Sequence, residues 1–177
     1  MSSDGQWTSV SLPYVTGEPV DAWAAEAKAH GGKGTQRLVT VDMRPAPESV
    51  ARALGLQPGE EVVLRSRVML LDDRPVELVD SYYPASIARG TRLAEMGKIP
   101  GGAVAHLVTL GYPSRRVVED VTARIATPAE AGEFGLDLPA AIVELSRVIL
   151  SDNDQPVEAS VMISPADARR LRYEITP

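Results

Sequence analysis

The sequence contains no cysteine, only two histidines and no long run of apolar residues. The absence of cysteine excludes disulfides, thiol catalysis and cysteine-bound metals. His30 and His106 lie far apart in the sequence, so neither a zinc site nor histidine-based hydrolysis is expected. No apolar stretch approaches the roughly 20 residues of a membrane-spanning helix, and the start of the chain lacks the pattern of a secretory signal. We therefore expect a cytoplasmic protein without metal, cofactor or membrane contact.

Catalytic and nucleotide-binding motifs are also missing. The sequence has no GxSxG, no phosphate-binding P-loop and no GxGxxG. Its 18 basic and 24 acidic residues give a net charge of −6, whereas a DNA-binding surface needs cations to replace condensed counterions. These features predict that the chain is not an enzyme and does not bind DNA by itself.

The composition is that of a folded globular domain. The chain has 177 residues, of which 44% are hydrophobic and 24% charged, close to the average for soluble domains. Residues 1–17 are polar and rich in glycine, serine and proline, and they predict a tail or linker before a single domain over 18–177.

The remaining sequence alternates between strand and helix patterns, and its strands come as hairpins. A helix capped by Asp21 should end at Gly31, and a last short helix should open at Pro165 and Asp167. The hairpins predict an α+β fold with a central antiparallel sheet. The other predicted strands are 37–43, 60–71, 76–83, 117–125, 141–150 and 156–163, and the other predicted helices are 47–54, 91–97, 102–110 and 128–134.

An internal repeat appears when the chain is shifted against itself by 80 residues. Residues 62–72 (VVLRSRVMLLD) match residues 142–152 (IVELSRVILSD) at six of eleven positions. The following Pro-Val-Glu recurs after one added residue, at 75–77 and 156–158. Hairpins with acidic turns can look alike by chance. The other interpretation, which we favour, is a duplicated helix–hairpin unit whose two hairpins lie in one sheet with approximate two-fold symmetry, which would place Arg67 opposite Arg147 and Glu77 opposite Glu158.

Arg65 and Arg67 are the first candidate site residues. Two residues apart on a strand, they point to the same face. Two guanidinium groups are hard to bury together without an anion. They therefore indicate a pocket that binds a carboxylate or phosphate through bidentate hydrogen bonds. The alternatives are a solvated strand face or internal pairing with Glu77 or Glu158.

Other polar residues of the hairpins could complete such a pocket. Glu158 lies mid-strand and could receive a ligand hydroxyl or amine, or pair with an arginine. Glu77 shares one strand face with Ser81 and Tyr83, which offer neutral hydrogen bonds. Arg124 lies near the end of its strand and could serve a site or the surface.

The order of these features resembles the UTRA effector-binding domain of HutC-type GntR-family transcriptional regulators. The resemblance spans residues 18–175. It is carried by the first helix with its Gly-Gly stop, Leu54-Gly55-Leu56, Arg65-x-Arg67, Arg74-Pro75-Val76-Glu77, Tyr82-Tyr83-Pro84, Gly111, Glu119-x-x-x-x-Arg124 and Gln155-Pro156-Val157-Glu158.

This resemblance implies a chorismate-lyase-like fold, a homodimer and a small-molecule pocket that controls an attached winged-helix DNA-binding domain. It implies that Arg65 and Arg67 hold the anionic end of the effector and that Glu158 contacts it. No winged-helix domain is expected within these residues, since only 17 precede the predicted domain. The sequence departs from the family at Val79, where a glutamate is common, and at Ser164, where a tyrosine is common. These departures argue against a phosphorylated amino sugar and leave another anionic metabolite as effector.

Two alternatives remain open on the sequence. One is an enzyme like chorismate lyase, with an arginine and Glu158 acting on the substrate, although fold analogy alone is weak evidence for activity. The other is a dimerisation or docking module whose pocket is filled by side chains, with Arg65 and Arg67 paired to Glu77 or Glu158.

Overall fold

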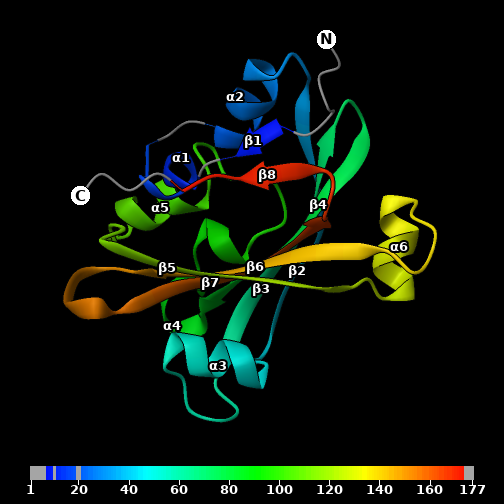
Figure 1. Ribbon diagram of the computed structural model, residues 1–177. Coiled ribbons are helices and arrows are strands. Elements are labelled where there is room, and N and C mark those ends of the chain that lie inside the picture. The colour runs from blue at the N-terminus through cyan, green and yellow to red at the C-terminus, as the bar shows by residue number, and fades with distance from the viewer. Residues whose placement is uncertain (1–6, 10, 19–20, 174–177) are drawn as a thin grey trace.

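A six-stranded antiparallel sheet forms the centre of the computed structural model, which describes residues 7–9, 11–18 and 21–173 (Figure 1). The strand order is β2-β3-β4-β7-β6-β5. This arrangement confirms the predicted α+β class and the antiparallel sheet. The strands are β2 (Gly34–Pro45), β3 (Glu61–Leu71), β4 (Arg74–Pro84), β5 (Arg116–Ile125), β6 (Ala141–Leu150) and β7 (Pro156–Pro165).

Capping residues mark the start of α2 and α6 and the end of α3 and α6. Asp21 Oδ1 accepts a hydrogen bond from the Ala24 amide (3.0 Å) at the start of α2, and Thr127 with Glu130 forms a capping box at the start of α6. Gly55 and Gly135 end α3 and α6 in the left-handed conformation, with φ of 65° and 66°. The longer helices are α2 (Ala22–Ala29), α3 (Glu48–Leu54), α5 (Ala103–Thr109) and α6 (Pro128–Phe134).

The internal repeat is visible in the strand order. The first copy runs β2-α3-β3-β4 and the second runs β5-α6-β6-β7, so the sheet order reads the same from both edges. The last strands of the copies, β4 and β7, pair at the centre with Ser81 opposite Ser160. The approximate two-fold axis therefore passes between these two strands.

The two faces of the sheet are covered by different elements (Figure 1). On one face, Val50 and Leu54 of α3 pack against Val62 and Ala159. On the other face, buried residues of the sheet such as Tyr83 and Ile149 pack with α1 (Leu12–Val15) and α5. Strand alternation places Arg67, Ser81 and Glu158 on this second face, which the α1 and α5 segments cover incompletely.

Two local predictions were wrong, and one short helix was missed. Residues 169–171 form a strand, β8, which pairs in parallel with β1 (Trp7–Ser9), and not a helix opened by Pro165. The region 91–97 contains only a 3-10 turn, η1 (Arg92–Ala94). A single helical turn, α4 (Ala85–Ala88), was not predicted.

The predicted tail, residues 1–17, lies partly outside the described residues. Its described part includes β1 and α1, and the side chain of Val15 is buried in the core. Among the described residues, none of the helices combines the length and the apolar character that crossing a bilayer would require.

Candidate functional site

A cavity of about 170 Å³ lies on the face of the sheet that α1 and α5 cover. Its floor is formed by β3, β4, β6 and β7, and its rim by residues of the segments 13–18, 21–23 and 98–105. A second cavity of about 180 Å³ adjoins it and shares six lining residues with it: Gln36, Arg67, Lys98, Ile99, Gly102 and Ala103. The floor residues are Arg67, Met69, Glu77, Val79, Ser81, Tyr83, Arg147, Glu158, Ser160 and Met162.

The strand register explains why polar residues gather on this floor. Arg65 pairs with Ser81, Ser81 with Ser160, and Ser160 with Arg147 across four neighbouring strands. Residues directly opposite each other in a sheet point to the same face. The alternation along each strand then adds Arg67, two residues from Arg65.

A chain of hydrogen bonds connects Arg67 to Glu158. Arg67 Nη2 donates to Ser81 Oγ (2.7 Å), and Ser81 Oγ lies 2.8 Å from Ser160 Oγ. Ser160 Oγ donates to Glu158 Oε1 (2.7 Å). Because a hydroxyl has one proton, Ser81 must donate to Ser160, so all protons of the chain point from the arginine to the carboxylate.

Three buried polar atoms of the cavity floor have no hydrogen-bond partner among the described residues: Arg67 Nε, Tyr83 OH and Glu158 Oε2. Buried polar groups are nearly always satisfied, and an unsatisfied one costs about 1–3 kcal/mol. Burial, followed by the nearby Glu158, raises the pKa of Tyr83 far above its usual value. The phenol therefore stays protonated and can donate to a bound molecule.

Arg65 points away from these atoms and holds a loop. Its Nη1 donates to the carbonyl oxygens of Arg92 (3.2 Å), Leu93 (3.0 Å) and Glu95 (2.7 Å), and its Nη2 donates to that of Gly97 (2.7 Å). The side chain is buried, and burial lowers its pKa. Arg65 lines only the second cavity, so of the two predicted arginines only Arg67 reaches the first.

Arg147 lines the first cavity but carries its own counter-ion. Its Nε donates to Glu119 Oε1 (2.6 Å), and both side chains are about nine-tenths buried. Glu119 Oε2 also accepts from Ser11 Oγ (2.8 Å) and Tyr173 OH (3.1 Å). Burial acts to raise the pKa of Glu119, but Arg147 and the hydroxyl donors hold it below its usual value. Through these hydrogen bonds, the Arg147–Glu119 pair connects the cavity wall to Ser11 and Tyr173, which lie near the two ends of the chain.

The other predicted residues divide between the cavity and the opposite face. Glu77, Ser81, Tyr83 and Glu158 all line the first cavity, and all four are buried. Arg124 does not line it: it pairs with Ile142, whose side chain packs against α6 on the face away from the cavity.

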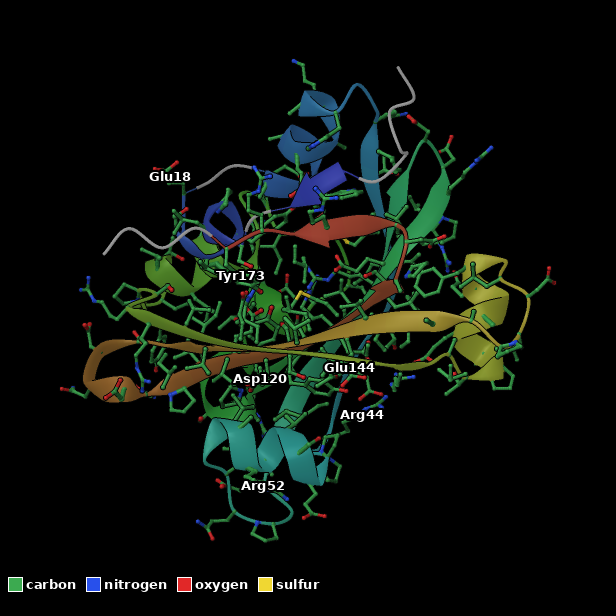
Figure 2. All side chains as sticks on the ribbon, viewed as in Figure 1. Glu18, Arg44, Arg52, Asp120, Glu144 and Tyr173 are labelled. Atoms are coloured by element: carbon green, nitrogen blue, oxygen red, sulfur yellow. The ribbon has the colours of Figure 1, made fainter. Side chains whose placement is uncertain are left out.

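Arg124 instead organises the start of α6. Its guanidinium donates to Glu130 (2.7 and 2.8 Å) and to Glu144 (3.1 Å). Hydrogen bonds from Arg124 hold the pKa of Glu130 at about 2, well below its usual value. Figure 2 shows Glu144 on the side of the sheet where α3 lies, and Tyr173 on the other side.

Several cavity residues were not assigned to the site from the sequence. Ser160 and Met162 continue the alternation that begins at Glu158, and that signal could have identified them. Trp23 reaches the cavity from α2, where its indole Nε1 donates to the carbonyl oxygens of Thr35 (2.9 Å) and Leu70 (3.2 Å). The rim segment 98–105 shows no pattern in the sequence that would have assigned it to the site.

The arrangement of these side chains suits a small polar ligand and offers no metal site. Among the described residues, no group of three or more histidine, aspartate or glutamate side chains could hold a metal ion. Among the described residues, Arg65 and Arg67 form no ion pair with Glu158, whose Oε2 has no hydrogen-bond partner there.

Comparison with known proteins gives consistent matches. The profile of the UTRA domain matches residues 29–170. Uncharacterized HTH-type transcriptional regulators of Streptomyces coelicolor and Rhizobium meliloti are 29% and 34% identical over 145 and 134 residues, covering 79% and 73% of this chain. The chain spans about half the length of these curated relatives (54% and 53%).

The crystal structure of PhnF from Mycobacterium smegmatis superposes with a TM-score of 0.81. It covers 97% of this chain and 72% of that one, at 22% identity. At this identity the likeness establishes a shared fold.

Proposed function

This chain belongs to the UTRA domain family of GntR-type transcriptional regulators, and we propose that its cavity binds a small anionic effector through Arg67. The observation that carries the proposal is the unpartnered Arg67 Nε at the cavity floor. An arginine is always protonated and offers a planar fork of donors. A carboxylate or phosphate of the effector would satisfy it by bidentate hydrogen bonds.

The neighbours of Arg67 suit this role. Ser81 accepts from Nη2 and so fixes the guanidinium in place, which reduces the entropy lost when an anion binds. Tyr83 and Glu158 offer a donor and an acceptor that have no partner of their own, and Glu77 completes the wall of the cavity. Arg65 acts as a positioning residue, because its four bonds to the loop 92–97 shape the second cavity next to Arg67.

Binding at this site would regulate transcription. The relatives that match the chain are named HTH-type regulators. We propose that effector occupancy changes DNA binding by a winged-helix domain beyond these 177 residues, within a cytoplasmic homodimer. Linkage requires that DNA and effector then change each other's affinity by the same factor. The proposal includes no catalytic step.

Thermal unfolding against a panel of anionic metabolites tests the proposal. A ligand that binds only the folded state adds about 2.7 kcal/mol at 100 times its dissociation constant, which is a shift of several degrees at this size. Arg67→Gln should abolish the shift, whereas Arg52→Gln, on the exposed surface of α3 (Figure 2), should leave it unchanged. A shift that persists in Arg67→Gln would contradict the assignment.

A further inference from the structure

Four of the seven charged side chains that line the cavity have partners. Lys98 Nζ lies 2.7 Å from Asp21 Oδ2, and Arg147 pairs with Glu119. Glu77 takes part in an interaction of its own. Glu18 is exposed, and Figure 2 shows it at the periphery of the molecule.

Two opposite charges remain on the cavity floor. Arg67 and Glu158 form no ion pair with any described residue, and each has one buried atom without a hydrogen-bond partner. They are held apart at the two ends of the Ser81–Ser160 chain. The serine protons are committed to that chain, so neither serine can donate to Glu158 Oε2.

We propose that the effector is a zwitterion, with an acid group that binds Arg67 and a protonated amine that binds Glu158. This inference rests on the proposed function and adds the second half of the ligand. One free cation and one free carboxylate are complemented by one anion and one cation. A purely anionic ligand would leave Glu158 buried beside it without a counter-charge, which is costly.

The size of the cavity and its apolar floor residues also limit the length of the ligand and favour an apolar segment between its two charged groups. Apolar side chains lie on the floor next to the serine pair: Val79 is opposite Arg67, and Met162 is opposite Val79. Both are buried, so they suit a short methylene chain between the two charged ends. An apolar cavity of about 150 Å³ holds a molecule of benzene's size, so about 170 Å³ suits roughly six to ten non-hydrogen atoms. The class is therefore a short ω-amino acid or aminoalkylphosphonate.

Matched pairs of probes separate the two halves of this claim. Isothermal titration compares 4-aminobutyrate with butyrate, and 3-aminopropylphosphonate with propylphosphonate, each up to about 10 mM to reach weak affinities. In the wild-type protein the aminated probe of at least one pair should bind about tenfold more tightly than its partner, since it alone supplies a charge-assisted bond to Glu158.

Variants of the two charged residues test which residue binds the amine and which binds the acid group of the probe. Glu158→Gln should bring the aminated probe to within about twofold of its partner, because the amide is neutral. Arg67→Gln should abolish binding of all four probes, and Glu48→Gln, on the exposed surface of α3, should change none of them. Thermal unfolding of each variant verifies that it is folded, and the wild-type comparison needs no variant.

The possible failures are distinguishable. Equal binding of aminated and plain probes to the wild type, or a preference that survives Glu158→Gln, overturns the zwitterion and leaves anion binding at Arg67 intact. Binding that survives Arg67→Gln overturns the proposed function itself. Failure of all four probes to bind overturns the short zwitterion, and the panel of anionic metabolites then decides the proposed function separately.

Discussion

Leu38 of β2 lies opposite Arg67 of β3. In the other half of the sheet, Glu119 of β5 lies opposite Arg147 of β6. The two positions are equivalent in the internal repeat, because β2-β3 and β5-β6 are corresponding strand pairs. The second copy thus neutralises its arginine internally, and the first copy does not. The asymmetry makes Arg67, and not Arg147, the cation that is available to a ligand.

Substitution of Arg65 should mainly lower stability, whereas substitution of Arg67 should mainly weaken binding. We expect Arg65→Lys to lower the free energy of unfolding by about 2–4 kcal/mol, because an ammonium cannot serve the four carbonyls of the loop 92–97. Arg67→Lys should cost less than about 1 kcal/mol, since Arg67 makes one hydrogen bond, but should weaken anion binding. Urea denaturation with titration of both variants measures this, and equal stability losses would contradict the assigned roles.

The close packing of α2 against the sheet should require glycine at position 34. A Cβ at this position would lie 2.8 Å from Ala27 Cβ and 2.9 Å from the Trp23 carbonyl oxygen. Gly34→Ala should therefore destabilise the fold by about 1–3 kcal/mol and move Trp23, which a change in tryptophan fluorescence would report.

Gly132 of α6 provides the matched control for Gly34. It has open space around its Cα and lies within a helix. Gly132→Ala should stabilise the fold by about 0.5–1 kcal/mol. Similar stability changes for the two substitutions would show that the contacts at Gly34 do not limit the packing of α2.

The Arg124–Glu130 pair should make stability depend on pH in the acid range. The folded state holds the pKa of Glu130 at about 2 against an ordinary value of 4.5. The stabilisation is therefore complete above pH 4.5 and is lost as the pH falls towards 2. The difference in unfolding free energy between wild type and Glu130→Gln should shrink over this interval, while the exposed Glu48→Gln shows a smaller change. A difference that is constant with pH would contradict the shifted pKa.

Glu119 should hold the N-terminal segment against the cavity. It accepts hydrogen bonds from Arg147, Ser11 and Tyr173. Glu119→Gln should therefore speed amide hydrogen exchange in residues 11–18, because the neutral amide binds Arg147 less strongly. Asp120→Asn, on the opposite face of the sheet (Figure 2), is the control. Unchanged exchange in Glu119→Gln would show that other contacts hold this segment.

The sheet could be predicted because its signals are local or repeated. Alternation, β-rich composition and turn residues predicted all six central strands, and the repeat predicted that the two hairpins share one sheet. The strand β8 escaped prediction because its partner β1 lies at the other end of the sequence, while Pro165 and Asp167 are typical of a helix start. The residue pattern of a short sequence segment carries no information about a partner strand that is distant in the sequence.

The candidate site could be predicted in part for the same reason. Glu77, Ser81 and Tyr83 share one strand face, so alternation alone placed them together. The positions of Arg65 and Arg124 depend on partners elsewhere in the fold: Arg65 is occupied by a loop about 30 residues away, and Arg124 faces α6. Which cation stays free depended on Leu38 and Glu119, whose equivalence appears only once the strands are paired.

The most direct test of the account is to give the first copy the carboxylate that it lacks. Leu38→Glu should form an internal pair with Arg67, as Glu119 does with Arg147, and Leu38→Gln is the neutral control of the same size. By isothermal titration with 3-aminopropylphosphonate, Leu38→Glu should lose at least about tenfold in affinity, while Leu38→Gln stays within about threefold of the wild type. If Leu38→Glu folds and binds the probe as tightly as Leu38→Gln, the free charge of Arg67 is not what the effector recognises.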